Sequence, residues 1–369
     1  MSGTQRDLIA TRAAFAAWLA KTLPDARDVE VGELSAPGAT GFSNETLFFD
    51  LAYTAGGGER VARRLVLRVQ PTENQVFPDY DLDKQIRTMR LLEKTDVPVP
   101  RVLWYEPDAA VLGAPFYVMA HVGGMIPTDN PPYHTGGWVT EAPPAEREAL
   151  WWSAVEALAA IHRLDWRAIG FGFLEDPVET RSPIAVQLDQ YRRYFEWAAR
   201  GKRHPTCEDA LAWLEANAPT GEPTRLEWGD ARIGNMIFGS GGRCVAVLDW
   251  EMVTLGSPEA DLAWFLFLDE HHSRGVGAPR LPGFPSREAT LARYAELTGH
   301  TPRHLPYYEV FAAFRFSVIM MRLAQQFTTL GLLPADSDFE TNNTPSRMLA
   351  DMLGLPSPAE AMAALATAP

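Results

Sequence analysis

Strand-like runs are concentrated in the first third of this 369-residue sequence, and this uneven distribution limits the possible folds most. Five runs rich in β-branched and aromatic residues are typical of strands, at 29–35, 45–53, 61–69, 101–106 and 115–122. GGG at 56–58 is a hairpin turn signal between the second and the third. Helical spacing occurs in this part only at 4–23 and at 80–94, which ends before PVP at 98–100. The pattern predicts a mostly antiparallel sheet with one inserted helix, ending near residue 120.

Beyond residue 145 the sequence is mainly helical. The expected helices lie at 146–163, 184–200, 206–217, 258–268, 286–298, 304–330 and 345–366. Strands followed by helices predict an α+β fold with two lobes, at residues 1–119 and 120–369, and ligands tend to bind in a cleft between such lobes. Residues 123–145 are rich in Pro and Gly without any period, so we expect either a binding loop or a disordered insert there.

Two short strand-like runs, 235–238 and 243–248, stand apart from these helices. SGG at 240–242 is a turn signal, so antiparallel pairing would bring Asn235 and Asp249 to the same end of a hairpin. Asp230 lies just outside that end, on the loop that leads into the first run. The sequence therefore predicts one free carboxylate beside an Asn and Asp pair.

This group of side chains has the parts that phosphoryl transfer requires. Carboxylate and amide oxygens suit Mg²⁺, which is typically held by one or two carboxylates together with substrate phosphates. A separate carboxylate can orient a nucleophilic hydroxyl and accept its proton. The alternative is that Asp230 and Asn235 are ordinary turn residues and that Asp249 caps a strand end. The combination of all three at this spacing favours the catalytic interpretation.

GDARIGN, VLDWEM and GSPEADLAWF, in this order, resemble the motifs of the aminoglycoside phosphotransferase and choline kinase-like family. The sequence is also similar to a bacterial subgroup related to the kinase domains fused to acyl-CoA dehydrogenases. The resemblance implies a protein-kinase-like fold, with a small antiparallel sheet lobe and a mainly helical lobe, and a phosphotransferase that uses Mg²⁺ and ATP or GTP. It implies that Asp230 is catalytic and that Asn235 and Asp249 hold the metal. Trp228 stands where the family has a His, and Asp261 matches a structural Asp.

The resemblance also implies a nucleotide site in the first lobe. Its phosphate loop would be SAPGATGFSNET at 35–46, with contacts from Gly38, Gly41, Ser43 and Asn44. Adenine would lie against Met119 and bond backbone groups near Ala120 and Val122. Arg68 matches the lysine that reaches the α- and β-phosphates, and Gln85 is the helix residue expected to face it. Because a guanidinium can bond phosphate through two parallel hydrogen bonds, we expect Arg68 to contact the nucleotide.

Composition limits the partners. The formal net charge of −14 argues against nucleic acid and anionic membrane surfaces. Two cysteines cannot form a disulfide framework, and no apolar signal core or membrane-spanning run is evident, which predicts a cytoplasmic protein. DEHHSRG at 269–275 is expected to be a solvated helix end rather than a zinc site.

The function favoured by these residues is transfer of a phosphoryl group from ATP or GTP to a hydroxyl of a small molecule. The alternatives are a nucleotide-binding pseudokinase with a regulatory role and a hydroxyacyl-CoA kinase, with nucleotidyl transfer on the same scaffold as a weaker one. Asp230, Asn235 and Asp249 together favour an enzyme. No residue run identifies the acceptor, and the oligomeric state is left open.

Overall fold

The computed structural model describes residues 6–36, 45–72, 75–175 and 178–367. It divides into two compact units: Met1–Glu93 with Val99–Gly123, and Lys94–Pro98 with Gly124–Pro369. The boundary expected between residues 119 and 120 would cut the strand Phe116–Ala120. Residues 94–98 belong to the second unit, where the Pro98 carbonyl oxygen accepts a hydrogen bond from the Val247 N–H at 2.8 Å.

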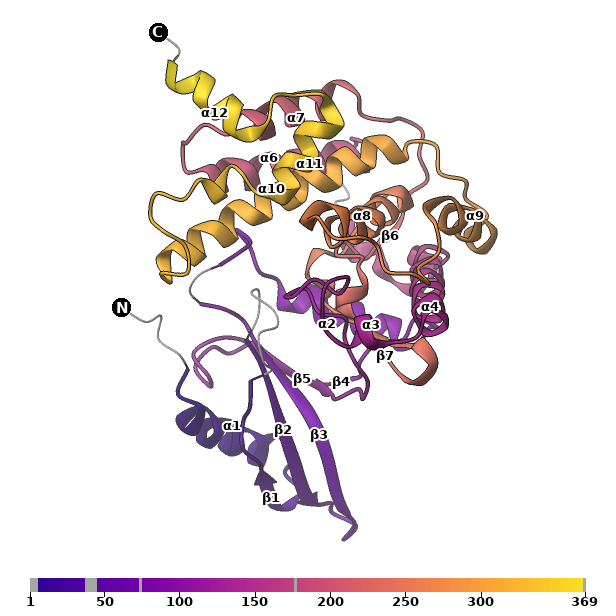
Figure 1. Cartoon of the computed structure of the whole chain (residues 1–369). Helices are drawn as coiled ribbons and strands as arrows, with labels where there is room; N and C mark the ends of the chain where they lie inside the picture. The colour runs from indigo at the N-terminus through magenta and orange to yellow at the C-terminus, as the bar shows by residue number, and fades with distance from the viewer. Residues whose placement is uncertain (1–5, 37–44, 73–74, 176–177, 368–369) are drawn as a thin grey trace. The chain divides into compact units, whose positions relative to one another are not determined.

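The first unit is built on a five-stranded antiparallel sheet in the order β1-β2-β3-β5-β4 (Figure 1). Its strands are β1 (Arg27–Val31), β2 (Glu45–Thr54), β3 (Arg60–Val69), β4 (Val102–Glu106) and β5 (Phe116–Ala120). Two helices accompany them, α1 (Leu8–Thr22) before the sheet and α2 (Leu82–Leu92) between β3 and β4. These elements overlap the predicted ranges, and the α+β class is confirmed.

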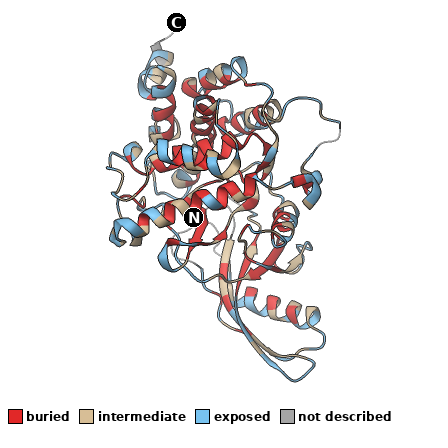
Figure 2. Ribbon diagram, turned by 90° about the vertical axis from the view of Figure 1, so that its right-hand side faces the viewer, coloured by how far each residue is buried: buried red, intermediate tan, exposed pale blue. Residues whose placement is uncertain are grey.

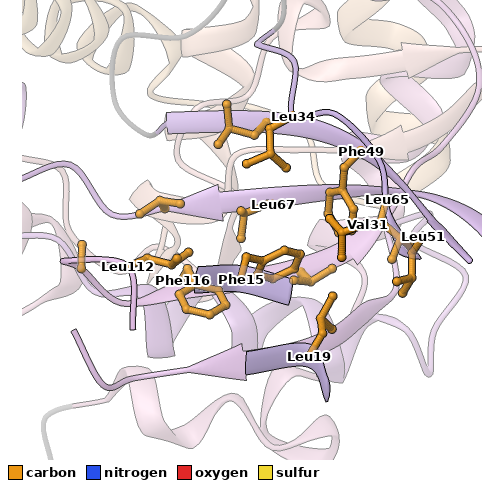
Figure 3. Close-up of a cluster of buried hydrophobic side chains, with 14 residues drawn as sticks. Phe15, Leu19, Val31, Leu34, Phe49, Leu51, Leu65, Leu67, Leu112 and Phe116 are labelled. Atoms are coloured by element: carbon orange, nitrogen blue, oxygen red, sulfur yellow. The ribbon is translucent and has the colours of Figure 1, made fainter. Parts of the chain in front are cut away.

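The core of this unit lies between α1 and one face of the sheet (Figure 3). Alternate residues of the two longest strands are buried there, namely Leu47, Phe49 and Leu51 of β2 and Leu65, Leu67 and Val69 of β3. Phe15 and Leu19, one turn apart on α1, pack against them, and the rings of Phe15 and Phe49 meet edge to face at 5.1 Å. Because side chains alternate along a strand, Thr46 and Arg68 belong to the opposite face.

The second unit is mainly helical. Its helices are α3 (Trp138–Glu141), α4 (Pro144–His162), α5 (Trp166–Ile169), α6 (Pro183–Ala199), α7 (Pro205–Ala216), α8 (Pro258–His271), α9 (Arg287–Thr298), α10 (Leu305–Thr329), α11 (Thr344–Leu353) and α12 (Pro358–Thr367). Residues 258–269 of α8 are all buried, and the longer α10 packs beside it through a Trp264–Phe316 ring contact at 5.8 Å. Figure 2 shows long buried stretches of these helices in red. A helix covered on all sides forms the centre of a core.

Two short antiparallel strand pairs interrupt these helices. They are β6 (Arg225–Glu227) with β9 (Thr254–Gly256), and β7 (Met236–Phe238) with β8 (Cys244–Val247). The second pair is the predicted hairpin. The first was not predicted, because each of its strands has only three residues and gives no periodic signal. It closes the base of the segment that contains Asp230, Asn235 and Asp249.

The helix predicted over 345–366 is two helices in the structure. Gly354 ends α11 in a left-handed conformation, with φ 62° and ψ 31°, and its N–H bonds back to the carbonyl of Ala350. Glycine adopts this conformation without steric cost, which favours a helix end there. Part of the Pro/Gly-rich segment pairs with β7, through two backbone hydrogen bonds between Met125 and Phe238. Within the described ranges, no helix combines the length and apolar character needed to cross a membrane.

Candidate active site

The backbone before Asp230 is held by a buried carboxylate. Asp261, in the first turn of α8, accepts hydrogen bonds from the N–H groups of Trp228 at 2.5 Å and Gly229 at 2.8 Å. Gly229 has φ +92°, and a Cβ at this position would lie 2.2 Å from the Met252 carbonyl oxygen. Only glycine fits both the conformation and the space. These contacts fix the path of the chain into Asp230.

The Asp230 carboxylate accepts hydrogen bonds from three side chains. Trp264 Nε1 lies 2.8 Å from Oδ1, and Asn235 Nδ2 lies 2.6 Å from Oδ2. Arg232 Nε lies 3.2 Å from both oxygens. The Asp230 side chain is still 15% exposed, so a small molecule can reach it. The three donors fix the orientation of the carboxylate, and the Arg232 contact, shared between both oxygens at 3.2 Å, is the longest of the three.

Asn235 and Asp249 come to the same end of the β7–β8 hairpin. The Leu248 N–H donates to the Asn235 carbonyl oxygen at 2.8 Å, and Asp249 follows directly with φ 54° and ψ 69°, which is rare for a residue other than glycine. The Asn235 amide nitrogen donates to the Asp230 carboxylate and, at 3.2 Å, to its carbonyl oxygen. Its amide oxygen accepts no hydrogen bond from the described residues. An open amide oxygen near a carboxylate fits the oxygen ligands that Mg²⁺ prefers.

Trp228 is fully buried and links the two halves of this region. Its indole Nε1 donates to the Leu248 carbonyl oxygen at 2.8 Å, and its ring lies 5.9 Å from that of Trp250. The loop before Asp230 is thereby joined to the residues on both sides of Asp249. A large aromatic ring fills this position, where the resemblance stated from the sequence implied a His.

An ion pair that was not predicted from the sequence lies beside the loop that contains Asp230. Arg232, besides contacting Asp230, bonds the carboxylate of Asp129, whose other oxygen lies 3.3 Å from His272 Nε2. Burial acts to raise the pKa of Asp129, but Arg232 and His272 outweigh it and hold that pKa well below its usual range. Asp129 therefore stays ionised. No sequence pattern could have found this partner, because it lies on the Pro/Gly-rich segment, far from Arg232 along the chain.

Trp264 and Arg315 were also missed. Both lie in helices whose apolar pattern identifies them as core elements, so neither residue gives a functional signal in the sequence. Trp264 donates to Asp230, and Arg315 Nη2 donates to the carbonyl oxygen of Gly229 at 2.8 Å. The central helices of the second unit therefore contact the Asp230 carboxylate and the backbone of the residue before it.

The nucleotide residues expected from the sequence lie in the first unit. Gly38, Gly41, Ser43 and Asn44 fall outside the described residues. Met119 and Ala120 end β5, and the Ala120 N–H is already bonded to the Arg101 carbonyl oxygen at 2.9 Å. The N–H of Val122 makes no backbone hydrogen bond within the described part of the chain. If adenine binds here, Val122 is the available donor.

Arg68 and Gln85 do not pair in the structure. Arg68 lies opposite Thr46 on β2, and its Nη1 donates to the Thr46 hydroxyl at 3.1 Å. Gln85 on α2 is buried, and its Nε2 has no hydrogen-bond partner among the described residues. The expected orientation of Arg68 by Gln85 is therefore not formed here, and the contact of each residue with nucleotide stays a prediction.

The sequence predicted that DEHHSRG at 269–275 is a solvated helix end, and this prediction was wrong. Asp269 is buried and accepts hydrogen bonds from Tyr133 Oη at 2.9 Å and Arg280 Nε at 2.6 Å, with His134 Nε2 at 2.9 Å. Burial lowers the pKa of the neighbouring His271 to about 3, so that ring stays neutral. The prediction failed because these partners come from distant segments that cover the helix end. Among the described residues, no cluster of three or more His, Cys, Asp or Glu side chains could hold a metal.

The fold is that of kinase-like phosphotransferases. A crystal structure of a protein from Ralstonia eutropha JMP134 assigned as an aminoglycoside phosphotransferase superimposes with a TM-score of 0.65. The match has 24% sequence identity and covers 92% of this chain and 95% of that one. At this identity the likeness establishes the two-part α+β architecture, which agrees with the fold predicted from the sequence.

The family is shown by sequence. The model of the family described as "Phosphotransferase enzyme family" matches residues 37–300, and the chain belongs to that family. The chain is accordingly a member of an enzyme family of phosphotransferases. The resemblance noted in the sequence is confirmed.

Two curated relatives show a further likeness. The probable acyl-CoA dehydrogenase IBR3 of Arabidopsis thaliana is 31% identical over 299 residues, which is 76% of this chain and 34% of that protein. Acyl-CoA dehydrogenase family member 11 of Gallus gallus is 34% identical over 251 residues, which is 67% of this chain and 30% of that protein. The chain spans about a third of the length of these relatives.

Proposed function

We propose that the chain transfers the γ-phosphoryl group of ATP or GTP, with Mg²⁺, to a hydroxyl group of a small molecule. The observation that carries the proposal is the Asn235 side-chain amide: its nitrogen donates to Asp230, and its oxygen accepts no hydrogen bond from the described residues. The Asn235 backbone carbonyl bonds the N–H of Leu248, the residue before Asp249. Asn235 therefore links the Asp230 carboxylate, which can accept the proton of a hydroxyl, to oxygen atoms that can coordinate a metal ion. Ordinary turn residues would instead bond nearby backbone N–H groups, and every hydrogen bond to the Asp230 carboxylate comes from a side chain.

In this reaction Asp230 orients the acceptor hydroxyl and takes its proton as the hydroxyl oxygen bonds to the γ-phosphorus. The bond between that phosphorus and the β,γ-bridging oxygen breaks, and ADP or GDP leaves. Asn235 and Asp249 would hold Mg²⁺, which neutralises phosphate charge when bound. Arg232 keeps its positive charge beside Asp230, and its Nη2 bonds no described residue. It can therefore add a hydrogen bond to the transferred group, since fixed charges aimed at developing charge stabilise a transition state.

A hydroxyacyl-CoA thioester is the second candidate for the acceptor. The observation that favours it is the likeness to proteins named as acyl-CoA dehydrogenases, of which this chain matches about a third. Two sites on one polypeptide act at high effective concentration toward each other. That arrangement would suit a thioester that both sites handle.

A transfer assay tests the proposal. Labelled γ-phosphate from MgATP or MgGTP is offered to an aminoglycoside, a macrolide, choline, ethanolamine, a hydroxyacyl-CoA and water. We expect transfer to at least one hydroxyl acceptor, dependence on Mg²⁺ and loss of transfer in Asp230→Asn. A protein that binds nucleotide but transfers phosphate to none of these acceptors would be a pseudokinase.

A further inference from the structure

We propose that Trp264 is a positioning residue for this phosphoryl transfer. Its indole N–H holds the Asp230 carboxylate in the orientation that receives the acceptor hydroxyl, and Arg315 holds the indole in place. The inference rests on the proposed function, because it assigns a role in the same reaction. It concerns two residues of the helical core, Trp264 on α8 and Arg315 on α10, which form no hydrogen bond with the predicted metal ligands or with the described nucleotide residues.

The first observation is the geometry at the carboxylate. Trp264 Nε1 donates to Oδ1 of Asp230 at 2.8 Å, while Asn235 Nδ2 donates to Oδ2 at 2.6 Å. Each oxygen thus has its own neutral donor, and rotation of the carboxylate about its last bond would break both contacts. Hydrogen bonds to a charged acceptor are stronger than those between neutral groups, so they resist this rotation.

The second observation is the chemistry of the donor. An indole N–H can only donate, and it neither gains nor loses a proton in the range where carboxylates and histidines titrate. Trp264 can therefore orient Asp230 without competing for the proton that Asp230 receives from the hydroxyl. Because Trp264 is only 1% exposed, water does not replace it as the donor.

The third observation is the buried guanidinium of Arg315. Its Cζ lies 4.4 Å from the centroid of the Trp264 ring and 5.0 Å from that of Tyr191, and its Nη2 donates to the Gly229 carbonyl oxygen. Its charge acts on the buried Glu227 and opposes the rise in the pKa of that carboxyl, but the two groups form no hydrogen bond. Among the described residues, Arg315 Nε has no hydrogen-bond partner. A buried, incompletely paired charge costs free energy that an apolar side chain would avoid.

The contacts of Arg315 explain why a charged residue occupies this buried position. Cation–π contact with Trp264 holds the indole ring, and the bond to Gly229 holds the backbone of the residue before Asp230. Arg315 thus fixes the donor and the acceptor of the Trp264–Asp230 hydrogen bond relative to each other. Catalytic groups held in place by a supporting layer of contacts lose rate when that layer is loosened.

The test compares two tryptophans. Trp264→Phe keeps an aromatic face for Arg315 and removes only the donor. Trp151→Phe is the matched control, because Trp151 is equally buried and its Nε1 donates to the Thr290 hydroxyl at 2.9 Å, away from Asp230. With MgATP and the fastest acceptor of the assay panel, Trp264→Phe should lower kcat at least about tenfold, the scale of one lost hydrogen bond to a charged group. The KM for MgATP should stay unchanged, and Trp151→Phe should match the wild type.

An NMR measurement tests the same hydrogen bond without requiring enzymatic turnover. The indole N–H resonance of Trp264 in the ¹⁵N-labelled full chain is assigned as the signal that Trp264→Phe removes. Asp230→Asn should displace this resonance, because a neutral amide replaces the charged acceptor, and should leave the Trp151 resonance in place. Arg315→Lys is the second variant: an ammonium cannot lie flat on the indole, so kcat should fall again with KM unchanged.

The outcomes separate the two hypotheses. An active Trp264→Phe enzyme with the kcat of Trp151→Phe, or a Trp264 resonance that does not respond to Asp230→Asn, overturns the positioning role and leaves the proposed function intact. An Arg315→Lys enzyme with wild-type kcat overturns the part assigned to Arg315. Failure of the wild-type protein to transfer phosphate to any acceptor in the panel overturns the proposed function, and the positioning role with it.

Discussion

Two groups of polar side chains, one around Asp230 and one on α2, differ in how many hydrogen bonds the described residues supply to them. Around the loop that contains Asp230, the partly exposed Asp230 and the buried Asp261 both accept several hydrogen bonds from other residues. On α2 of the first unit, Gln85 and Thr88 are also buried, but Gln85 Nε2 and Thr88 Oγ1 have no partner among the described residues. A buried polar group without a partner costs free energy. The chain supplies hydrogen-bond partners to the carboxylates around Asp230, whereas its described residues supply none to Gln85 Nε2 and Thr88 Oγ1 on α2.

This difference predicts a gradient of mutational effects. Groups that are fixed before substrate arrives contribute most to the rate, because their orientation is not adjusted during the reaction. Groups whose partners are not supplied by the chain contribute less until a ligand or another segment completes them. Substitutions should therefore cost most at Asp230, less at the metal ligands and at Arg68, and least at Gln85.

The largest effect is expected from Asp230→Asn. The amide keeps the shape of the side chain but cannot accept the proton of the acceptor hydroxyl, so kcat should fall by about 10²- to 10⁴-fold. Nucleotide affinity should stay nearly unchanged, because Asp230 is not expected to touch the nucleotide. Single-turnover transfer and calorimetric titration of ATP measure the two quantities separately.

The control for this variant is Asp338→Asn, which changes an exposed carboxylate that accepts a hydrogen bond from Asn342 Nδ2 at 2.8 Å. It should match the wild type in both measurements. A wild-type turnover rate in Asp230→Asn would show that Asp230 does not accept the proton of the acceptor hydroxyl. It would also contradict the predicted order of mutational effects.

The next largest effect is expected from Asp249→Ala. If Asp249 and Asn235 hold Mg²⁺, the variant should bind MgATP about 10- to 100-fold more weakly, while its affinity for ATP without Mg²⁺ stays the same. Calorimetric titrations of ATP with and without Mg²⁺ measure this difference. Equal Mg²⁺ dependence in the variant and the wild type would show that Asp249 is not a ligand.

The sequence predicted the hairpin after Asp230 but not the side chains that contact the Asp230 loop from the helices. The β7–β8 hairpin is set by a local turn signal and two short apolar runs, so the meeting of Asn235 and Asp249 followed from spacing alone. Trp264 and Arg315 contact the loop from α8 and α10, and their contacts depend on how those helices pack. Helical periodicity identifies them as core residues but does not say which buried side chain meets which loop.

The same limit explains the errors. The pairing of β6 with β9 and the network around Asp269 both join segments far apart in the sequence, and neither leaves a periodic pattern. The fold class and most element positions were predictable, because alternation and helical spacing are local properties. The expected contact between Arg68 and Gln85 came from resemblance to a kinase lobe, and the structure contains no hydrogen bond between them.

An intermediate effect is expected at Arg68. Arg68→Ala should raise the nucleotide KM or lower kcat by at least about tenfold, the scale of one lost charged hydrogen bond. Arg68→Lys should recover only part, because a point charge cannot reproduce two parallel hydrogen bonds to phosphate. Steady-state kinetics with varied MgATP measures both variants. Arg63, an exposed neighbour on β3, gives the matched control Arg63→Ala, which should match the wild type.

A wild-type KM and kcat in Arg68→Ala would show that the first unit binds nucleotide without this residue. Complete recovery by Arg68→Lys would show that charge alone matters and that the guanidinium geometry does not. The first result would remove Arg68 from the predicted nucleotide contacts, whereas the second would keep a positive charge at this position as one of them.

The smallest effect is expected from Gln85→Met. The sign of its change in the free energy of unfolding tests the difference between the two groups. Met fills a similar volume without a donor, so removing the unpaired Nε2 should leave the free energy of unfolding unchanged or raise it by up to about 1 kcal/mol. Asn235→Leu makes the same amide-to-apolar change in the other region. It should lower the free energy of unfolding by at least about 1.5 kcal/mol, because Asn235 Nδ2 bonds a charged carboxylate. Urea denaturation of both variants measures the contrast. A Gln85→Met protein destabilised as much as Asn235→Leu would mean that Gln85 has a partner in solution, and that both regions are equally organised by the chain.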